Sequence, residues 1–170
     1  MVVTGVALDT KQKDRLRHVI RVTMVTIAIL LLFFAVVVPI INNAVALGIE
    51  GDLKAIPLPA NTEVIESTSV AGRLVGNGNG MQYFGAVLLK SGLSPEKLQE
   101  HYAAYRTVSF HCVLERQTSS ALRPAGQALP GAPDLSFRAS VEGEGYYVLY
   151  SWGSAPTWLR DILNSDMRGH

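Results

Sequence analysis

An uninterrupted apolar run near the N-terminus constrains this sequence more than any other feature. It covers residues 22–41, reads VTMVTIAILLLFFAVVVPII, and contains no charged residue, no amide and no glycine. As a helix the run would be about 30 Å long, which matches the hydrocarbon core of a bilayer. The helix of a soluble domain rarely stays apolar on every side over such a length. The run therefore predicts a transmembrane helix, which we place at residues 19–41, with residues 22–41 in contact with the lipid bilayer.

The fate of this helix after insertion has two interpretations. Ala44-Val45-Ala46 resembles the small-residue pattern that signal peptidase cuts, and the nearby Pro39 and Asn42-Asn43 agree with cleavage after Ala46. The apolar run is nevertheless longer than the roughly 7–15 residues of a signal-peptide core, and it follows a long leader. We favour an uncleaved signal anchor.

Charge predicts the orientation of the helix. The first 21 residues carry five basic and two acidic side chains, whereas the chain after residue 41 carries ten basic and twelve acidic ones. Because basic residues beside a span resist translocation, residues 1–18 are expected to form a cytoplasmic tail and the C-terminal domain to lie outside, as in a bacterial cytoplasmic (inner) membrane protein. The basic side chains that set this topology are Lys11, Lys13, Arg15, Arg17 and Arg21.

The remainder of the chain predicts a small domain without a disulfide. Cys112 is the only cysteine, and it alternates with Phe110 and Leu114, so it is expected in the core. The domain is slightly acidic and has no basic stripe, which argues against nucleic-acid binding. Residues 42–60 are expected to be an extended membrane-proximal linker because of Pro57 and Pro59. The domain itself is assigned to residues 61–170.

The order of predicted elements indicates an α+β fold. The expected order is β-β-α-β-β-β-α, an antiparallel sheet with its helices packed on one face. Ser94 and Pro95 mark the start of the first helix of the domain as N-cap and first helical residue. The predicted elements are a hairpin over 63–75 and 81–90, a helix from 95, a strand over 109–117, a long loop over 118–134, a hairpin over 135–142 and 146–152, and a helix over 155–163. The packing face of the last helix is expected to consist of Trp158, Leu159, Ile162 and Leu163.

The glycine-rich stretch VGNGNGM at residues 75–81 is interpreted as a hairpin tip. A phosphate-binding loop would lead into a helix and include a Lys-Ser/Thr pair, whereas a strand follows here. Asn-Gly pairs favour the positive φ angles of hairpin turns. As an exposed tip, Asn77 and Asn79 are candidate partner contacts.

A second candidate surface lies in GYYVLYSW. Tyr146, Tyr150 and Trp152 alternate onto one face of a strand whose opposite face is also apolar, so the strand is expected to be central. Core packing is the preferred interpretation of these rings. If helices cover only one face, the same rings become partner contacts.

No residue is assigned to catalysis, to a cofactor or to a metal. His101 and His111 do not have the spacing of a compact metal site, Glu142 and Glu144 suit a solvated turn, and no Gly-x-Ser-x-Gly motif occurs.

The expected function is therefore that of a single-pass membrane protein whose outer domain is a non-enzymatic interaction or assembly module with a protein partner. One alternative is a small-ligand-binding or sensor domain with an apolar pocket beneath the long loop. The other is an enzyme in which His111, Glu115 and that loop converge.

Overall fold

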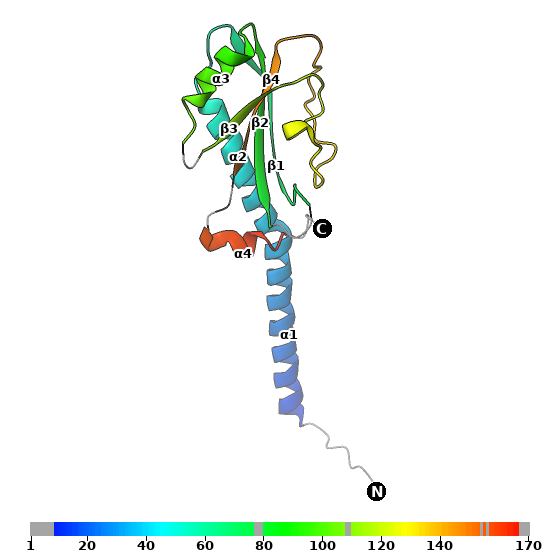
Figure 1. Cartoon of the computed structure of the whole chain (residues 1–170). Coiled ribbons are helices and arrows are strands. Elements are labelled where there is room, and N and C mark those ends of the chain that lie inside the picture. The colour runs from blue at the N-terminus through cyan, green and yellow to red at the C-terminus, as the bar shows by residue number, and fades with distance from the viewer. Residues whose placement is uncertain (1–8, 77–79, 108–109, 154, 156, 167–170) are drawn as a thin grey trace.

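The computed structural model describes residues 9–76, 80–107, 110–153, 155 and 157–166. It is an α+β structure in which one long N-terminal helix carries a small antiparallel sheet at its C-terminal half (Figure 1). The predicted tip residues Asn77 and Asn79 lie outside the described residues.

The long helix runs without a break from Thr10 to Ala55. It consists of α1 (Thr10–Leu32), a π-helical turn (Phe33–Val37) and α2 (Val38–Ala55). The wide turn follows from Pro39, which cannot donate a backbone hydrogen bond and whose ring crowds the preceding turn. The Val38 N–H accordingly bonds to the Phe33 carbonyl, five residues back.

The backbone differs here from the expected linker. Residues 42–55 are helical and not extended, and the chain becomes extended only after Ala55, where Pro57 and Pro59 follow. The prolines therefore favour the end of the helix, because the residue before a proline is disfavoured in the helical conformation. The extended segment that they produce is much shorter than the predicted residues 42–60.

The sheet has four strands in the order β1-β2-β4-β3, and each neighbouring pair is antiparallel. The strands are β1 (Thr62–Gly72), β2 (Gln82–Ser91), β3 (Cys112–Arg116) and β4 (Tyr146–Gly153). β1 and β2 form the predicted first hairpin, but Gly72 pairs with Gln82, so residues 73–81 make a longer connection than a two-residue turn. β4 is central, as its two apolar faces predicted.

Each face of the sheet has its own cover. On the helix face, α2 and α3 (Pro95–Ala103) bury the odd-numbered apolar residues of β2 and β4, including Val87 and Leu149. On the loop face, residues 117–141, which we call the covering loop, lie over Phe84, Leu88 and Tyr150 (Figure 1). Of the two predicted helices of the domain, α3 packs on the helix face, where α2 joins it, whereas the last helix, α4 (Arg160–Leu163), lies across the long helix at the base of the domain (Figure 1). The long loop fills the other face of the sheet.

Two glycines allow α2 to lie close against the sheet. A Cβ on Gly85 of β2 would stand 2.8 Å from the Glu50 backbone nitrogen, and one on Gly153 of β4 would collide with the Ile49 side chain. Tyr83 of β2 pairs with Gly153, so the two glycines lie near each other on neighbouring strands. Because neither glycine has a side chain, α2 can cross the sheet in close contact with the strand backbones.

The predicted second hairpin is wrong. Residues 135–142 form no strand and make only an isolated bridge between Ser136 and Ala121. Both edges of β4 are already occupied by β2 and β3, so no place is left for a further partner strand. Phe137 instead lies buried against the loop face, and the segment crosses the sheet without joining it.

The two short helices lie where the sequence predicts them, but only some of the residues predicted to pack inward are buried. Ser94 caps α3 and accepts a hydrogen bond from the Lys97 N–H. The C-terminal turn, residues 157–159 followed by α4 (Arg160–Leu163), buries Leu163 but leaves Trp158 and Ile162 exposed. Trp158 and Ile162 were predicted to belong to its packing face and do not.

Candidate functional site at the junction of helix and domain

A buried polar cluster joins the long helix to the C-terminal end of the chain. The Asn42 side-chain amide donates to the Leu163 carbonyl (3.1 Å) and to Oδ2 of Asp166 (2.7 Å). The Tyr83 hydroxyl donates to Oδ1 of Asn42 (2.6 Å). Asn42, Tyr83 and Asp166 are all fully buried, so these hydrogen bonds form out of contact with water.

The electrostatics of the cluster favour a neutral tyrosine. Burial raises the pKa of the Tyr83 hydroxyl, and the negative charge of Asp166 raises it further. The hydroxyl therefore stays a donor to Asn42 over the physiological range. Because the cluster draws on α2, β2 and the segment after α4, it holds three distant parts of the chain in one arrangement.

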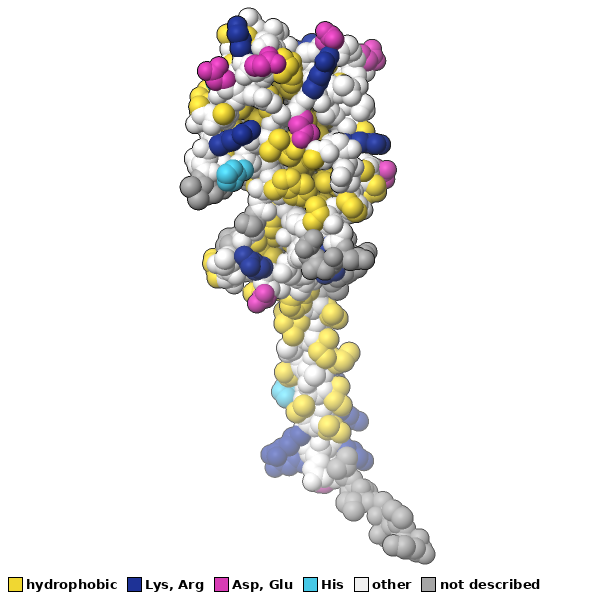
Figure 2. Space-filling view, viewed as in Figure 1, with side chains coloured by type: hydrophobic (Ala, Val, Ile, Leu, Met, Phe, Trp, Pro, Cys, Tyr) yellow, Lys and Arg dark blue, Asp and Glu magenta, His cyan; other side chains and the backbone are white. Residues whose placement is uncertain are grey.

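The long helix leaves the domain immediately below this cluster. Val38 is fully buried, whereas every residue from Thr10 to Val37 is exposed apart from the half-buried Phe34. We call residues 10–37 the free helix. Figure 2 shows hydrophobic side chains along it and Lys and Arg side chains gathered at its N-terminal end. These include the five basic residues predicted to set topology, and Arg17 also contacts Asp14 (3.4 Å).

The helix Thr10–Ala55, of which the free helix is the first part, is long and apolar enough to cross a membrane, and no other described residues cover the side chains of the free helix. Scattered exposed apolar residues are common on soluble proteins, but a continuous apolar cylinder is not.

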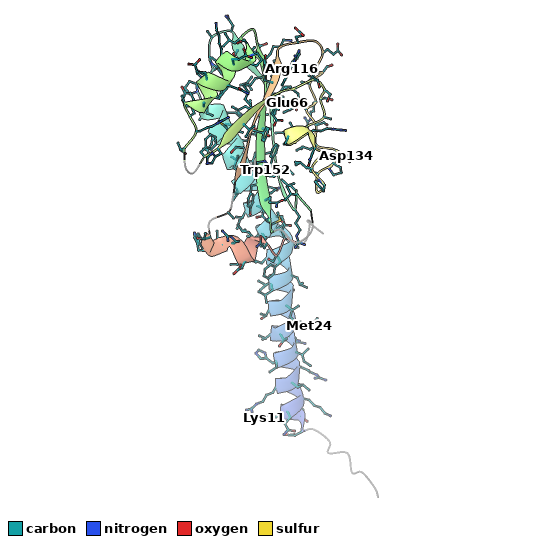
Figure 3. All side chains as sticks on the ribbon, viewed as in Figure 1. Lys11, Met24, Glu66, Arg116, Asp134 and Trp152 are labelled. Atoms are coloured by element: carbon teal, nitrogen blue, oxygen red, sulfur yellow. The ribbon has the colours of Figure 1, made fainter. Side chains whose placement is uncertain are left out.

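The three aromatic residues predicted as partner contacts, Tyr146, Tyr150 and Trp152, differ in how far they are exposed. Tyr150 is 4% exposed, and its hydroxyl donates to Glu115 (2.7 Å). Tyr146 is half-buried beneath the Lys90 ammonium group, 3.8 Å from the ring centroid. Trp152, labelled in Figure 3, is 39% exposed. Its ring packs edge-on against that of Phe84. Only Trp152 therefore keeps a sizeable surface for a partner.

The covering loop is fastened to the sheet by glutamates. Both carboxylate oxygens of Glu115 accept from the Ala125 N–H, at 3.1 and 3.2 Å, while one of them also accepts from Tyr150. Glu66 of β1 accepts from the Ala139 N–H (2.8 Å). Leu122, Leu129 and Phe137 fill the space beneath the loop, where a ligand pocket had been considered.

The residues considered for enzymatic chemistry do not converge. His111 and Glu115 are four positions apart in an extended segment, about 13 Å along the chain, and Glu115 is engaged by the covering loop. His101 contacts the Pro57 carbonyl (2.7 Å). Cys112 is buried, as predicted, and among the described residues no group of three potential metal ligands occurs.

Sequence reasoning missed Asn42 and Asp166. Asn42 was considered only as part of a signal-peptidase region. The sequence signal that could have pointed to Asn42 is the pair of asparagines directly after the long apolar run. An uncharged polar side chain at that point can be buried in the domain and make hydrogen bonds there.

Two buried tyrosines give opposite predictions for stability. The Tyr102 hydroxyl is buried and makes no hydrogen bond within the described residues, whereas that of Tyr150 is bonded to Glu115. Tyr102→Phe is therefore expected to stabilise the protein by about 1 kcal/mol, and Tyr150→Phe to destabilise it by about 1–2 kcal/mol. Denaturant unfolding at pH 7 measures both, and equal effects would contradict the assigned environments.

The buried Tyr102 hydroxyl is also expected to make the protein less stable at alkaline pH. Burial, followed by the nearby Cys112 and Tyr105, raises the pKa of Tyr102 to about 12. An unfolded tyrosine loses its proton near pH 10, so the folded state holds more protons between about pH 10 and 12. Stability is expected to fall as pH rises through this window, and the fall is expected to be smaller in Tyr102→Phe.

Comparison of the chain with protein-family models, with curated proteins and with solved structures finds no match. The functional conclusions below therefore rest on the residues and geometry of this chain.

Proposed function

We propose that this chain is a single-pass membrane protein with a cytoplasmic N-terminus, whose outer domain is a non-enzymatic interaction or assembly module held at the membrane surface. The observation that carries the proposal is the single helix Thr10–Ala55. Residues 22–37 of this helix are apolar and exposed apart from the half-buried Phe34, and residues 38–55 form a helix that packs in the core of the folded domain.

The burial pattern favours a bilayer segment nearer the N-terminus than residues 22–41. Val38, Pro39 and Asn42 belong to the interior of the domain, so lipid contact is expected to end at Val37. Residues 19–37 form a helix of about 28 Å, enough to cross the hydrocarbon core. Arg17 and Arg21 would then extend toward the inner head groups.

The junction also favours an uncleaved anchor. Cleavage after Ala46 would remove Val38 and Asn42 from the domain, leaving Tyr83 without its hydrogen-bond acceptor. A domain that shares a helix with its anchor cannot swivel about a flexible linker. Such a mounting suits a module that presents one surface to a partner at a set height and orientation.

For the partner contact we propose the exposed part of the loop face around Trp152. Val113 of β3 pairs with Tyr150 and lies on this same face, where it is also exposed. The covering loop does not bury these two side chains, and Figure 2 shows hydrophobic side chains gathered on this side of the domain. An exposed Trp beside an aliphatic residue is typical of the centre of a protein interface.

A small-ligand sensor is the alternative with a specific site. A hollow of about 350 Å³ lies between the end of α2 and the residues that follow α3, and its lining includes Ile56, Tyr105 and Phe110. Stabilisation of the domain by a small molecule, lost on Phe110→Asp, would favour this alternative.

The topology can be tested with single introduced cysteines. Glu144→Cys is expected to react with a membrane-impermeant maleimide on intact spheroplasts, and Lys11→Cys only after permeabilisation, because the two residues lie at opposite ends of the molecule. The wild-type protein is the control, since its one cysteine is buried. The reverse labelling pattern would overturn the orientation, and labelling of both sites on intact spheroplasts would overturn the membrane span.

The partner surface can be tested by photo-crosslinking in native membranes. A photo-reactive phenylalanine analogue at Trp152 is expected to capture one reproducible protein, and the additional change Val113→Asp is expected to abolish that product. The same analogue at Glu100, exposed on α3, is the control. Equal products from both positions, or none from Trp152, would contradict the proposed contact.

A further inference from the structure

The C-terminal turn, residues 157–163, exposes an apolar surface beside the free helix. Trp158 is 79% exposed and Ile162 is 42% exposed, whereas Leu163 of the same turn is fully buried. Figure 1 shows α4 lying across the long helix at the base of the domain. We call residues 157–163 the foot.

Hydrogen bonds fix the position of the foot along the axis of the long helix. The Leu163 carbonyl accepts from the Asn42 side chain, and the Asn164 side chain accepts from the Met81 N–H at the start of β2 (2.8 Å). Asn42 follows Val37, the last residue of the free helix, by five positions, which is about 7.5 Å along the axis. The head-group layer of one leaflet is about 5–7.5 Å thick, so the contact between Asn42 and the foot lies at the outer edge of that layer.

We propose that the foot is a lipid-binding site, in which Trp158 and Ile162 enter the head-group layer of the outer leaflet and Arg160 contacts lipid phosphates. This inference rests on the proposed membrane anchor. It gives the domain a second attachment to the bilayer, beside the helix, and thereby limits how far the domain can tilt.

Three observations favour lipid over a protein as the occupant. The exposed side chains belong to a turn at the base of the domain, where the free helix leaves it, and the bilayer is proposed to cover that helix. Tryptophan is enriched at the membrane interface because its ring is apolar and its N–H can bond to polar head groups. Arg160 is exposed between Trp158 and Ile162 and can pair with anionic head groups.

The chain offers a matched pair of fluorescent reporters, because it contains only two tryptophans. Trp152→Phe leaves Trp158 as the reporter, and Trp158→Phe leaves Trp152, which lies on the sheet away from the foot (Figure 3). Each full-length variant is reconstituted in phosphatidylcholine vesicles with a nitroxide quencher near the head groups. A parallel sample carries the quencher deep in the acyl chains.

We expect Trp158 emission to shift to shorter wavelength and to fall about twofold with the shallow quencher, and to change less with the deep one. Trp152 emission should change little with either. In vesicles containing phosphatidylglycerol the quenching of Trp158 should increase, and Arg160→Glu should remove that increase.

Three other outcomes would contradict different parts of this proposal. If the protein floats with the vesicles but Trp158 is quenched no more than Trp152, the foot does not bind lipid and the anchor stands. If Trp158 emission is shifted but unquenched, protein and not lipid covers it, which overturns the inference. If the protein does not float with the vesicles, the membrane anchor itself is wrong.

Discussion

Gly85→Ala is expected to lower the free energy of unfolding by about 3 kcal/mol. A Cβ at this position would stand 2.8 Å from the Glu50 backbone nitrogen and 3.1 Å from its Cα, so a side-chain rotation cannot relieve the overlap. The helix must move away from β2, which weakens the packing of the whole helix face. Chemical denaturation of the full-length protein in detergent measures the change, and hydrogen exchange in α2 should accelerate with it.

Gly48→Ala in the same helix is the matched control. Gly48 is exposed, and a Cβ there would meet no atom of the described residues within 4 Å. Alanine in a helix is more favourable than glycine, so this change is expected to stabilise the protein by about 0.5–1 kcal/mol. Opposite signs at Gly85 and Gly48 would support the close crossing of helix and sheet, whereas destabilisation at both or at neither would contradict it.

Asn42→Ala is expected to destabilise the protein by about 3–4 kcal/mol. The change removes three hydrogen bonds of 2.6–3.1 Å and leaves the Tyr83 hydroxyl without its acceptor in a buried site. Tyr83→Phe, which removes only one of these bonds, is expected to cost about 1–1.5 kcal/mol. Thermal or denaturant unfolding measures both, and hydrogen exchange at residues 163–166 reports release of the C-terminal segment.

Two further variants check that the effect comes from the polar cluster. Leu47→Ala removes an exposed side chain of the same helix and is expected to change stability by about 0.5 kcal/mol or less. Asn42→Asp keeps the shape but brings a second carboxylate toward Asp166, so it is expected to be at least as damaging as Asn42→Ala. A tolerated Asn42→Asp would contradict the assigned role of the cluster.

Local patterns predicted most elements of the fold. The apolar run predicted a long helix, Ser94-Pro95 predicted the start of α3, and the two-sided apolar pattern of GYYVLYSW predicted a central strand. These features depend on side-chain periodicity and capping within a few residues. The failed hairpin at 135–142 shows the limit of this reasoning, because an apolar segment can pair with a strand or lie across a sheet with the same pattern.

The candidate site depended on contacts between distant residues. Asn42 contacts Asp166, which lies 124 positions further along the chain, and no local pattern relates the two. Trp158 and Ile162 were expected to pack inward with Leu163, yet only Leu163 does so. Periodicity gives the faces of a short helix but cannot say which of its faces the remaining chain will cover.

The sequence by itself determined that an apolar helix of membrane-spanning length precedes a small α+β domain without a disulfide. Only the tertiary structure decided where that helix ceases to be free and becomes part of the core. The reason is that burial of α2 depends on Gly85 and Gly153, which lie far along the chain and open a path across the sheet, and on the buried cluster of Asn42, Tyr83 and Asp166. Those contacts end the free helix at Val37 and place the C-terminal turn beside it.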